Sequence, residues 1–262
     1  MPAQSNDTFE DLARYYDAIM TDVDYDRWEI ATANIAQLLP KDFLHLDAAC
    51  GTGTLLRALN PYKWNSVGVD LSPAMLRLSK KKRTKSPLAA ADLRRLPFDG
   101  SFDYITCLFD SMNFLLKKAA IRSAIKSFAR ALSPGGILYF DVVTEEMILQ
   151  HFADQVWTER NGRFSTKWSS KYNRTTKICE TRIKVKRGPE ATLHERVYEI
   201  DFIKKAIEDA GLTLLGAHDA ETWRTVRKKS VRVDFVCTKG PVDAYAKPFK
   251  NAARRMQECL KD

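Results

Sequence analysis

The fold is decided by the stretch Leu46-Asp47-Ala48-Ala49-Cys50-Gly51-Thr52-Gly53. This stretch completes a short apolar run, residues 43–48, and leads into a helix-like segment, residues 55–59. Small residues at a strand-to-helix turn let the backbone turn tightly and approach a ligand closely. Any nucleotide-binding turn between a strand and a helix could share this pattern. The stretch therefore predicts an α/β sheet first, and a bound ligand only with further support.

Apolar runs alternate with helical patterns through the first 142 residues, which predicts a parallel sheet with helices on both faces. Ser72 before Pro73 is typical of a helix start, and that helix should run through Lys82. A helix of roughly twenty residues should end near Leu132, because Ser133-Pro134-Gly135-Gly136 follows it. The five predicted strands are residues 43–48, 66–70, 88–91, 104–109 and 137–143.

The pattern changes between residues 156 and 200, where apolar and polar side chains alternate with a period of two. Such alternation predicts antiparallel strands with one covered face. We expect strands at residues 163–172, 176–186 and 193–200, inserted as a meander between the fifth strand and the next helix. The remaining predicted elements are a helix at 201–210, strands at 212–218 and 231–237, and a basic terminal helix at 242–260.

Charge is distributed unevenly along the chain. The whole sequence has 42 Lys and Arg against 33 Asp and Glu, a net charge of +9. Residues 1–150 contain 18 of each sign, so all of the excess lies in residues 151–262, with 24 basic and 15 acidic side chains. Such a region is compatible with nucleic acid, an anionic membrane or an acidic small substrate, and equally with a solubilising surface.

The five cysteines are odd in number and none is closely spaced with another, so neither a disulfide framework nor a zinc site is predicted. This usage fits a reducing, cytoplasmic setting. The first residues are polar and acidic, which is unlike a secretion signal, and no apolar run is long enough for a membrane span. We therefore expect a cytoplasmic protein with no metal and no membrane partner.

Two carboxylates follow the glycine-rich turn at informative spacings. Asp70 ends the second predicted strand, 17 residues after Gly53, where a carboxylate can accept hydrogen bonds from both ribose hydroxyls. Asp92 ends the third strand, where it can accept from an adenine amine while Leu93 packs on the ring. The ends of these strands converge on one crevice in a doubly wound sheet.

In order and spacing, residues 43–142 resemble class I S-adenosylmethionine (SAM)-dependent methyltransferases. The motifs are the turn at 47–53, Gly-Val-Asp-Leu-Ser-Pro-Ala-Met-Leu, Ala-Asp-Leu, Leu-Pro-Phe-Asp-Gly-Ser-Phe-Asp and Leu-Ser-Pro-Gly-Gly. Ala49 is a departure, since the family often has glycine there. The resemblance implies an α/β fold: a Rossmann-like, doubly wound, seven-stranded sheet, here with an inserted antiparallel β meander. It also implies SAM as the cofactor.

Carried over position by position, the resemblance assigns the cofactor site. Ala49, Gly51 and Gly53 would lie against the methionine part of SAM, and Asp47 would order the glycine loop. The other implied contacts are Asp70 to the ribose, Leu71 and Met75 beside the adenine, Asp92 and Leu93 around the adenine amine and ring, Leu108 near the sulfonium, and Tyr16 as a cover from the N-terminal helix.

A narrower similarity links Tyr16-Asp17, residues 22–28 and residues 107–113 to a bacterial subgroup that includes sugar-amine N-methyltransferases. Together with the patterns along the chain, it gives four segments: 1–142, N-terminal helices and the SAM-binding core; 143–200, inserted strands that cover the active site or form a dimer interface; 201–240, the rest of the core sheet; and 241–262, a basic C-terminal helix. The predicted reaction is methyl transfer to an N or O nucleophile of a small-molecule acceptor.

Candidate catalytic residues are Asp110 and Asn113 after the fourth strand, with Phe109 beside them, and His218 after the sixth. A general base is needed only if the nucleophile arrives protonated. We expect a small-molecule acceptor. The basic second half is compatible with an anionic acceptor, and the inserted strands are compatible with a homodimer interface. The alternatives are an RNA or protein methyltransferase that uses the basic second half, an NAD(P)-dependent oxidoreductase, and a non-catalytic binding module; nucleic acid is not the favoured partner.

Overall fold

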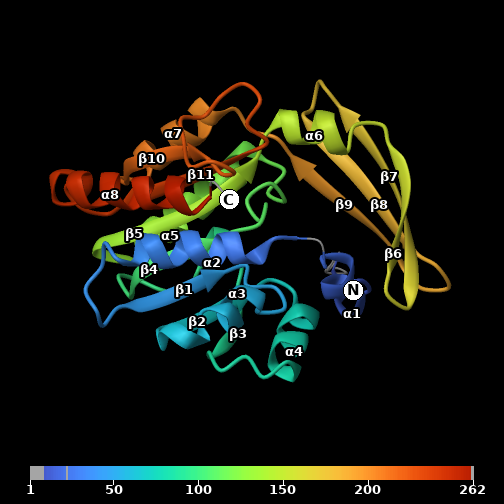
Figure 1. The fold of residues 1–262 in the computed structure, drawn as a ribbon, viewed down its shortest axis with the longest axis horizontal. Coiled ribbons are helices and arrows are strands. Elements are labelled where there is room, and N and C mark those ends of the chain that lie inside the picture. The colour runs from blue at the N-terminus through green and yellow to red at the C-terminus, as the bar shows by residue number, and fades with distance from the viewer. Residues whose placement is uncertain (1–8, 22, 261–262) are drawn as a thin grey trace.

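The computed structural model describes residues 9–21 and 23–260, and its core is a seven-stranded sheet (Figure 1). The strand order is β10-β11-β5-β4-β1-β2-β3. All neighbours are parallel except β11, which runs antiparallel to both β10 and β5. The strands are β1 (Leu44–Ala48), β2 (Asn65–Asp70), β3 (Leu88–Ala90), β4 (Phe102–Cys107), β5 (Leu132–Val143), β10 (Thr213–Asp219) and β11 (Arg232–Thr238). The predicted Rossmann-like fold is confirmed.

Helices cover both faces of this sheet. On one face, α5 (Lys118–Ala131) and α7 (Ile200–Asp209) bury their apolar sides in a core cluster with β4 and β5. On the other face, α2 (Tyr25–Ala36), α3 (Thr54–Ala58) and α8 (Asp243–Cys259) do the same in a second cluster. Two short 3-10 helices complete this part, η1 (Asn60–Tyr62) and η2 (Leu93–Arg95).

Two helix starts explain how the sequence directs the chain near the strand ends. Ser72 caps α4 (Pro73–Lys81), since its hydroxyl accepts a hydrogen bond from the Met75 backbone N–H and Pro73 fills the first helical position, as predicted. Asp24 caps α2 in the same way through the Arg27 N–H. Each cap turns the chain sharply at the edge of the sheet where the site lies.

The insertion forms a separate antiparallel sheet of order β6-β7-β8-β9, which stands to one side of the core (Figure 1). Its strands are β6 (Val156–Asn161), β7 (Phe164–Asn173), β8 (Ile178–Val185) and β9 (Glu190–Arg196). The predicted two faces are observed: Trp168 and Ile183 are buried, while Lys167 and Lys184 point outward. The buried face packs on α1 (Ala13–Ile19), and α6 (Glu145–His151) covers one end.

The helix α1 packs between the inserted sheet and helix α4 of the core. Leu12 and Ile19 pack against the inserted sheet, whereas Ala13 packs against Ala74 and Met75 of α4. Of the stretch at residues 22–28 that the sequence singled out, Asp22 lies outside the described residues. Val23 and Asp24 precede α2, and residues 25–28 form its first turn.

Several element boundaries differ from the expectations. The helix before β5 has 14 residues rather than about twenty, because residues 108–117 form a turn and loop instead. The 133–136 stretch belongs to β5 rather than to a loop before it. The insertion has a fourth strand, β6, and its last strand ends at Arg196 rather than at residue 200. None of the helices in residues 9–21 and 23–260 combines the length and apolarity that crossing a bilayer would need.

Candidate functional site

A hollow that opens to solvent lies where β1 and β4 end. Its wall comes from α1, α2, the glycine-rich turn and the residues just after β4. The residues that line it are Tyr16, Tyr25, Trp28, Asp47, Ala49, Cys50, Gly51, Thr52, Thr54, Leu55, Leu108, Phe109 and Ser111. Of the predicted cofactor residues, Tyr16, Asp47, Ala49, Gly51 and Leu108 are in this wall.

The glycine-rich turn is shaped by three left-handed residues. Ala49, Gly51 and Gly53 have φ values of 64°, 54° and 75°. A Cβ on Gly51 would meet no atom within 4 Å, so open space lies directly in front of this backbone. A Cβ on Gly53 would collide with the Ser79 hydroxyl, so that glycine is required for helix packing. The turn therefore combines a tight backbone path with an open cradle.

Asp70 stands at the end of β2, beside the turn. Its carboxylate accepts hydrogen bonds from the backbone N–H groups of Gly51 and Ser72, each at 2.8 Å. This carboxylate thus fixes the glycine-rich turn and the start of α4 at once. Leu71, the next residue, is 67% exposed and offers an apolar surface beside this carboxylate.

The remaining predicted adenine contacts do not line the hollow. The Asp92 carboxylate receives the Arg94 side chain, with Nε at 2.9 Å from both oxygens, and this bonding holds the pKa of Asp92 below its ordinary value. Leu93 is buried in the core, and Met75 packs against Ala13 and Ala74. Their roles toward adenine stay predictions.

A buried chain of hydrogen bonds ends at Asp47. The His45 ring joins Ser66 Oγ at 3.0 Å through Nδ1 and Thr106 Oγ1 at 2.9 Å through Nε2, and the Thr106 hydroxyl donates to Asp47 Oδ1 at 3.0 Å. Burial lowers the pKa of His45 to about 3, so its ring is neutral. Burial likewise raises the pKa of Asp47 to about 7, and the Thr106 bond partly opposes that rise.

The helix α1 is fastened over the glycine-rich turn by Asp17. Its carboxylate accepts the Thr52 hydroxyl at 2.7 Å and pairs with Lys82, which follows α4. The preceding residue, Tyr16, lines the hollow, and its role as a cover over the cofactor stays a prediction. Burial, followed by the charges of Tyr25 and Asp110, raises the pKa of Tyr16 well above its ordinary value, so the phenol keeps its proton.

The chain leaves β4 through two consecutive left-handed residues, Phe109 and Asp110, with φ values of 60° and 62°. Non-glycine residues adopt this conformation at a cost of about 1 kcal/mol or more each. The Asp110 backbone N–H donates to Asp141 Oδ1 at 3.1 Å, which helps to hold the turn. Strained backbone persists only where the surrounding structure holds it in place, and such positions are common at functional sites.

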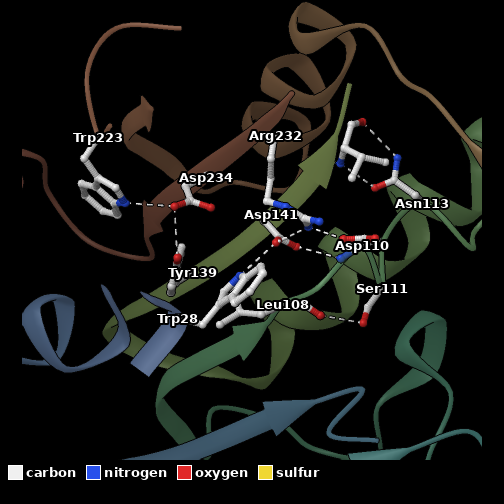
Figure 2. Close-up of polar contacts among 11 residues, drawn as sticks. Trp28, Leu108, Asp110, Ser111, Asn113, Tyr139, Asp141, Trp223, Arg232 and Asp234 are labelled. Carbon is white, nitrogen blue, oxygen red and sulfur yellow. Dashed lines mark hydrogen bonds and ion pairs between the residues drawn. The ribbon is translucent and has the colours of Figure 1, made fainter. Parts of the chain in front are cut away.

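Arg232 ties this turn to the sheet (Figure 2). Its Nη1 bonds to the carboxylates of both Asp110 and Asp141, the latter at 2.7 Å. Trp28 Nε1 donates to the same Asp141 oxygen at 3.1 Å, and the guanidinium lies over the rings of Trp28 and Phe109. Burial would lower the pKa of Arg232, but the two carboxylates raise it. Burial raises the pKa of Asp110, opposed by Arg232.

The structure corrects the placement of two predicted catalytic residues. Asn113 is fully buried, and its side-chain amide forms hydrogen bonds with the backbone of Val143 and Arg196. It therefore fastens β5 and β9 together rather than facing an acceptor. His218 stacks on Trp223 with ring centres 5.0 Å apart and touches Phe249 of α8. It is not among the residues that line the hollow.

Sequence reasoning missed Asp141, Arg232 and Glu195. Burial of Glu195, on β9, raises its pKa to about 8. The negative charge of Asp110 adds to this rise, and the positive charge of Arg232 opposes it. Arg232 and Asp110 are separated by 122 residues in the chain, so no local spacing could have signalled the pair. Tyr25 and Trp28 lay inside the stretch that resembled the narrower subgroup, without an assigned role.

Comparison with known proteins agrees with this geometry. A family model described as a methyltransferase domain matches residues 46–136, which contain the glycine-rich turn, Asp70 and Asp92. The structure of a SAM-dependent methyltransferase from Clostridium acetobutylicum superimposes with a TM-score of 0.77 at 25% identity, covering 88% of this chain and 98% of that one. The chain is a class I SAM-dependent methyltransferase.

Two sequence relatives give the methyltransferase its narrower context. "Putative methyltransferase YqeM" from Bacillus subtilis is 34% identical over 166 residues, 62% of this chain and 66% of that protein. The dTDP-4-amino-2,3,4,6-tetradeoxy-D-glucose N,N-dimethyltransferase from Saccharopolyspora spinosa is 31% identical over 131 residues, 48% of this chain and 52% of that protein. The methyltransferase thus resembles sugar-amine methyltransferases in part of its length.

The residues present fit SAM as the cofactor. The Gly51 backbone faces open space, the Asp70 carboxylate is fixed beside it, and Leu71 exposes an apolar surface next to both. Asp47 adds a buried carboxylate in the wall of the hollow. These groups suit a ligand that combines a charged amino-acid part, a ribose and a flat ring.

Proposed function

We propose that this methyltransferase transfers methyl groups to the amine of a small, sugar-like acceptor. The observation that carries the proposal is the group of carboxylates and aromatic rings after β4. Asp110 lies next to the wall of the hollow formed by Trp28 and Phe109, and Tyr25 completes the aromatic side. Asp110 and Asp141 together oppose only one cation, Arg232, so the cluster does not repel a positively charged amine, and aromatic faces favour one.

The donor side supports the same proposal. SAM, when bound, supplies a methyl group that is already activated, so the protein needs only to align the nucleophile and exclude water. The glycine-rich turn, Asp70 and Leu71 would hold it, with Asp47 near the charged end. Tyr16 and Tyr25, which keep their protons because their pKa values are raised by burial, would close the hollow against solvent.

The inserted sheet fits the role of acceptor cover. Its apolar face packs on α1, and the end of β9 is bonded to the loop after β4. The acceptor would therefore lie between the strand ends of the core and this cover. Residues 143–200 then form the segment that selects the acceptor, while the core segment holds the donor.

The proposal is tested with purified protein, SAM and a panel of dTDP-linked amino sugars like those named for the relatives. Mass spectrometry should show products heavier by one methylene unit per transfer. The matched panel has a hydroxyl in place of each amine. Methylation of the amines only supports the proposal; equal methylation of the hydroxyl panel, or of neither panel, contradicts it.

A matched pair of variants checks that the product depends on the described site. Asp70→Ala should weaken SAM binding about 10²-fold, because a charged acceptor of two backbone hydrogen bonds is lost and the turn loosens. Asp99→Ala removes an equal charge from an exposed position and should leave binding unchanged. Calorimetric titration with SAM measures both, independently of the acceptor.

A further inference from the structure

Glu195 lies on the inner face of the inserted sheet. Along β9, Ala191 and Leu193 are buried against α1, whereas Glu190 and His194 are exposed. Side chains alternate between the two faces of a strand, so Glu195 points to the same side as Ala191 and Leu193. It is therefore the acidic side chain that β9 directs toward the core.

Hydrogen bonds fix this end of β9 beside Asp110. The Arg196 N–H donates to the Asn113 carbonyl at 2.8 Å, and Asn113 Nδ2 donates to the Arg196 carbonyl at 2.9 Å. The Asn113 N–H in turn donates to the Asp110 carbonyl at 2.7 Å. These hydrogen bonds connect Arg196, the residue after Glu195, with the strained turn after β4 through Asn113.

The charged and titratable groups that act electrostatically on Glu195 come from four parts of the chain. They are Asp110 after β4, Arg232 of β11, Tyr16 of α1 and Cys179, the residue opposite Glu195 on β8. The Arg232 guanidinium is already bonded to Asp110 and Asp141. Within residues 9–21 and 23–260, no ion pair or side-chain hydrogen bond joins the Glu195 carboxyl to a partner.

The other groups nearby are poorly suited to accept a proton. Asp110 is held by Arg232, so its carboxylate is engaged. Tyr16 and Tyr25 have raised pKa values and remain phenols, and burial raises the pKa of the Cys179 thiol to about 11. Glu195, whose pKa is raised to about 8, can take up and release a proton near neutral pH.

We propose that Glu195 is the general base that takes the proton from the acceptor's ammonium group. This inference rests on the proposed amine methylation. The Glu195 carboxylate accepts one proton from R–NH₃⁺, which leaves a lone pair on nitrogen. That lone pair forms the new N–C bond as the C–S bond breaks and its electrons return to sulfur. The methylated ammonium then leaves, and Glu195 gives its proton to solvent.

The decisive experiment needs no acceptor. Sinefungin carries an amine where SAM carries its methyl-sulfonium group, while S-adenosylhomocysteine is neutral there. We expect the wild-type protein at pH 9 to bind sinefungin about tenfold more tightly than S-adenosylhomocysteine, because a charge-assisted contact to Glu195 is gained. In Glu195→Gln this ratio should fall about fivefold or more, by calorimetric titration.

The matched control is Glu190→Gln, which removes the same charge from the exposed face of the same strand. It should keep the wild-type ratio. If Glu195→Gln and Glu190→Gln both keep that ratio, Glu195 does not face the reacting position and the inference is overturned. Circular dichroism of each variant separates a folding defect from a local effect, and Glu195→Asp offers a variant that retains the charge and should retain part of the ratio.

A second readout uses an amino sugar that the protein methylates. The kcat of the wild type should rise with pH through about 8, where Glu195 becomes a carboxylate. Glu195→Gln should lose this rise and at least about 10²-fold in kcat, with KM little changed. An unaltered pH profile in Glu195→Gln contradicts the base. If no amino sugar is methylated, the proposed function is contradicted. The ratio of the sinefungin and S-adenosylhomocysteine affinities then still tests whether Glu195 faces the reacting position.

Discussion

The two halves of the site are built in opposite ways. The proposed donor half, made of residues 46–53 with Asp70 and Leu71, comes from one short part of the chain and is held by hydrogen bonds from backbone N–H groups to the Asp70 carboxylate. The proposed acceptor half, made of residues 108–113 with Asp141, Arg232 and Glu195, joins side chains from β5, β9 and β11 through buried charges. The first half depends on a short motif and the second on the assembled fold, so variants should affect them differently.

The largest expected effect is in the acceptor half. Arg232→Leu leaves Asp110 and Asp141 buried without their cation, which should lower the free energy of unfolding by about 3–5 kcal/mol. Urea denaturation measures the loss. Arg224→Leu, at an exposed position nearby in sequence, should stay within about 0.5 kcal/mol. A similar small change for Arg232→Leu would mean that the charge cluster does not hold this half together.

Asn113→Ala should affect the proposed acceptor half and leave the proposed donor half unchanged. The change removes the hydrogen bonds of the Asn113 side-chain amide and leaves buried backbone groups of Val143 and Arg196 without partners. The free energy of unfolding should fall by about 2–3 kcal/mol. Hydrogen exchange should accelerate in β8 and β9 but not in β1 and β2. Asn251→Ala, exposed on α8, is the matched control. Uniform acceleration across both sheets would refute the idea that Asn113 acts locally.

In the donor half, Asp47→Asn should stabilise the protein in a pH-dependent way. The pKa of Asp47 is raised to about 7 from 3.8, so the folded state binds the proton more tightly than the unfolded state. That contribution is complete below about pH 4 and is lost as pH rises through 7. Asparagine removes this loss, so the variant should gain roughly 2–4 kcal/mol over wild type at pH 8.

The control for Asp47→Asn is the same comparison of variant and wild type made at pH 4. The gain should largely disappear at pH 4, where both side chains are neutral, and urea denaturation at the two pH values measures it. His45 titrates in both proteins, so its contribution cancels in the difference. A constant gain at both pH values would show that Asp47 is ionised throughout.

The smallest expected effect is at Ala49. Glycine adopts a φ of 64° without the steric cost that alanine bears, so Ala49→Gly should stabilise the fold by about 0.5–1 kcal/mol. Ala58→Gly, the same change at the last residue of the right-handed helix α3, should destabilise the protein by about 0.5–1 kcal/mol. Thermal denaturation compares the two. Destabilisation by both changes would mean that the turn relaxes to accommodate alanine.

The donor half could be predicted because its information is local. The spacing from Gly53 to Asp70 is fixed by one strand and one helix, and the Ser72–Pro73 cap follows from side-chain chemistry alone. The two faces of the inserted strands could also be predicted, since period-two alternation reports burial directly.

The acceptor half resisted prediction for a physical reason. Asn113 looked catalytic because a polar residue after β4 faces either the crevice or the backbone, and the sequence cannot distinguish the two. Arg232 reads as an ordinary basic residue of a net-positive region until the fold places it between two carboxylates. His218 follows a strand end as expected, but α8 and Trp223 enclose it.

The helix α1 belongs to both halves at once. Asp17 fastens it to Thr52 and Lys82 on the donor side, and Leu12 and Ile19 rest on the acceptor cover. The same short helix therefore carries contacts to the glycine-rich turn and to the inserted sheet. A displacement of α1 would break contacts on both sides of the hollow at once.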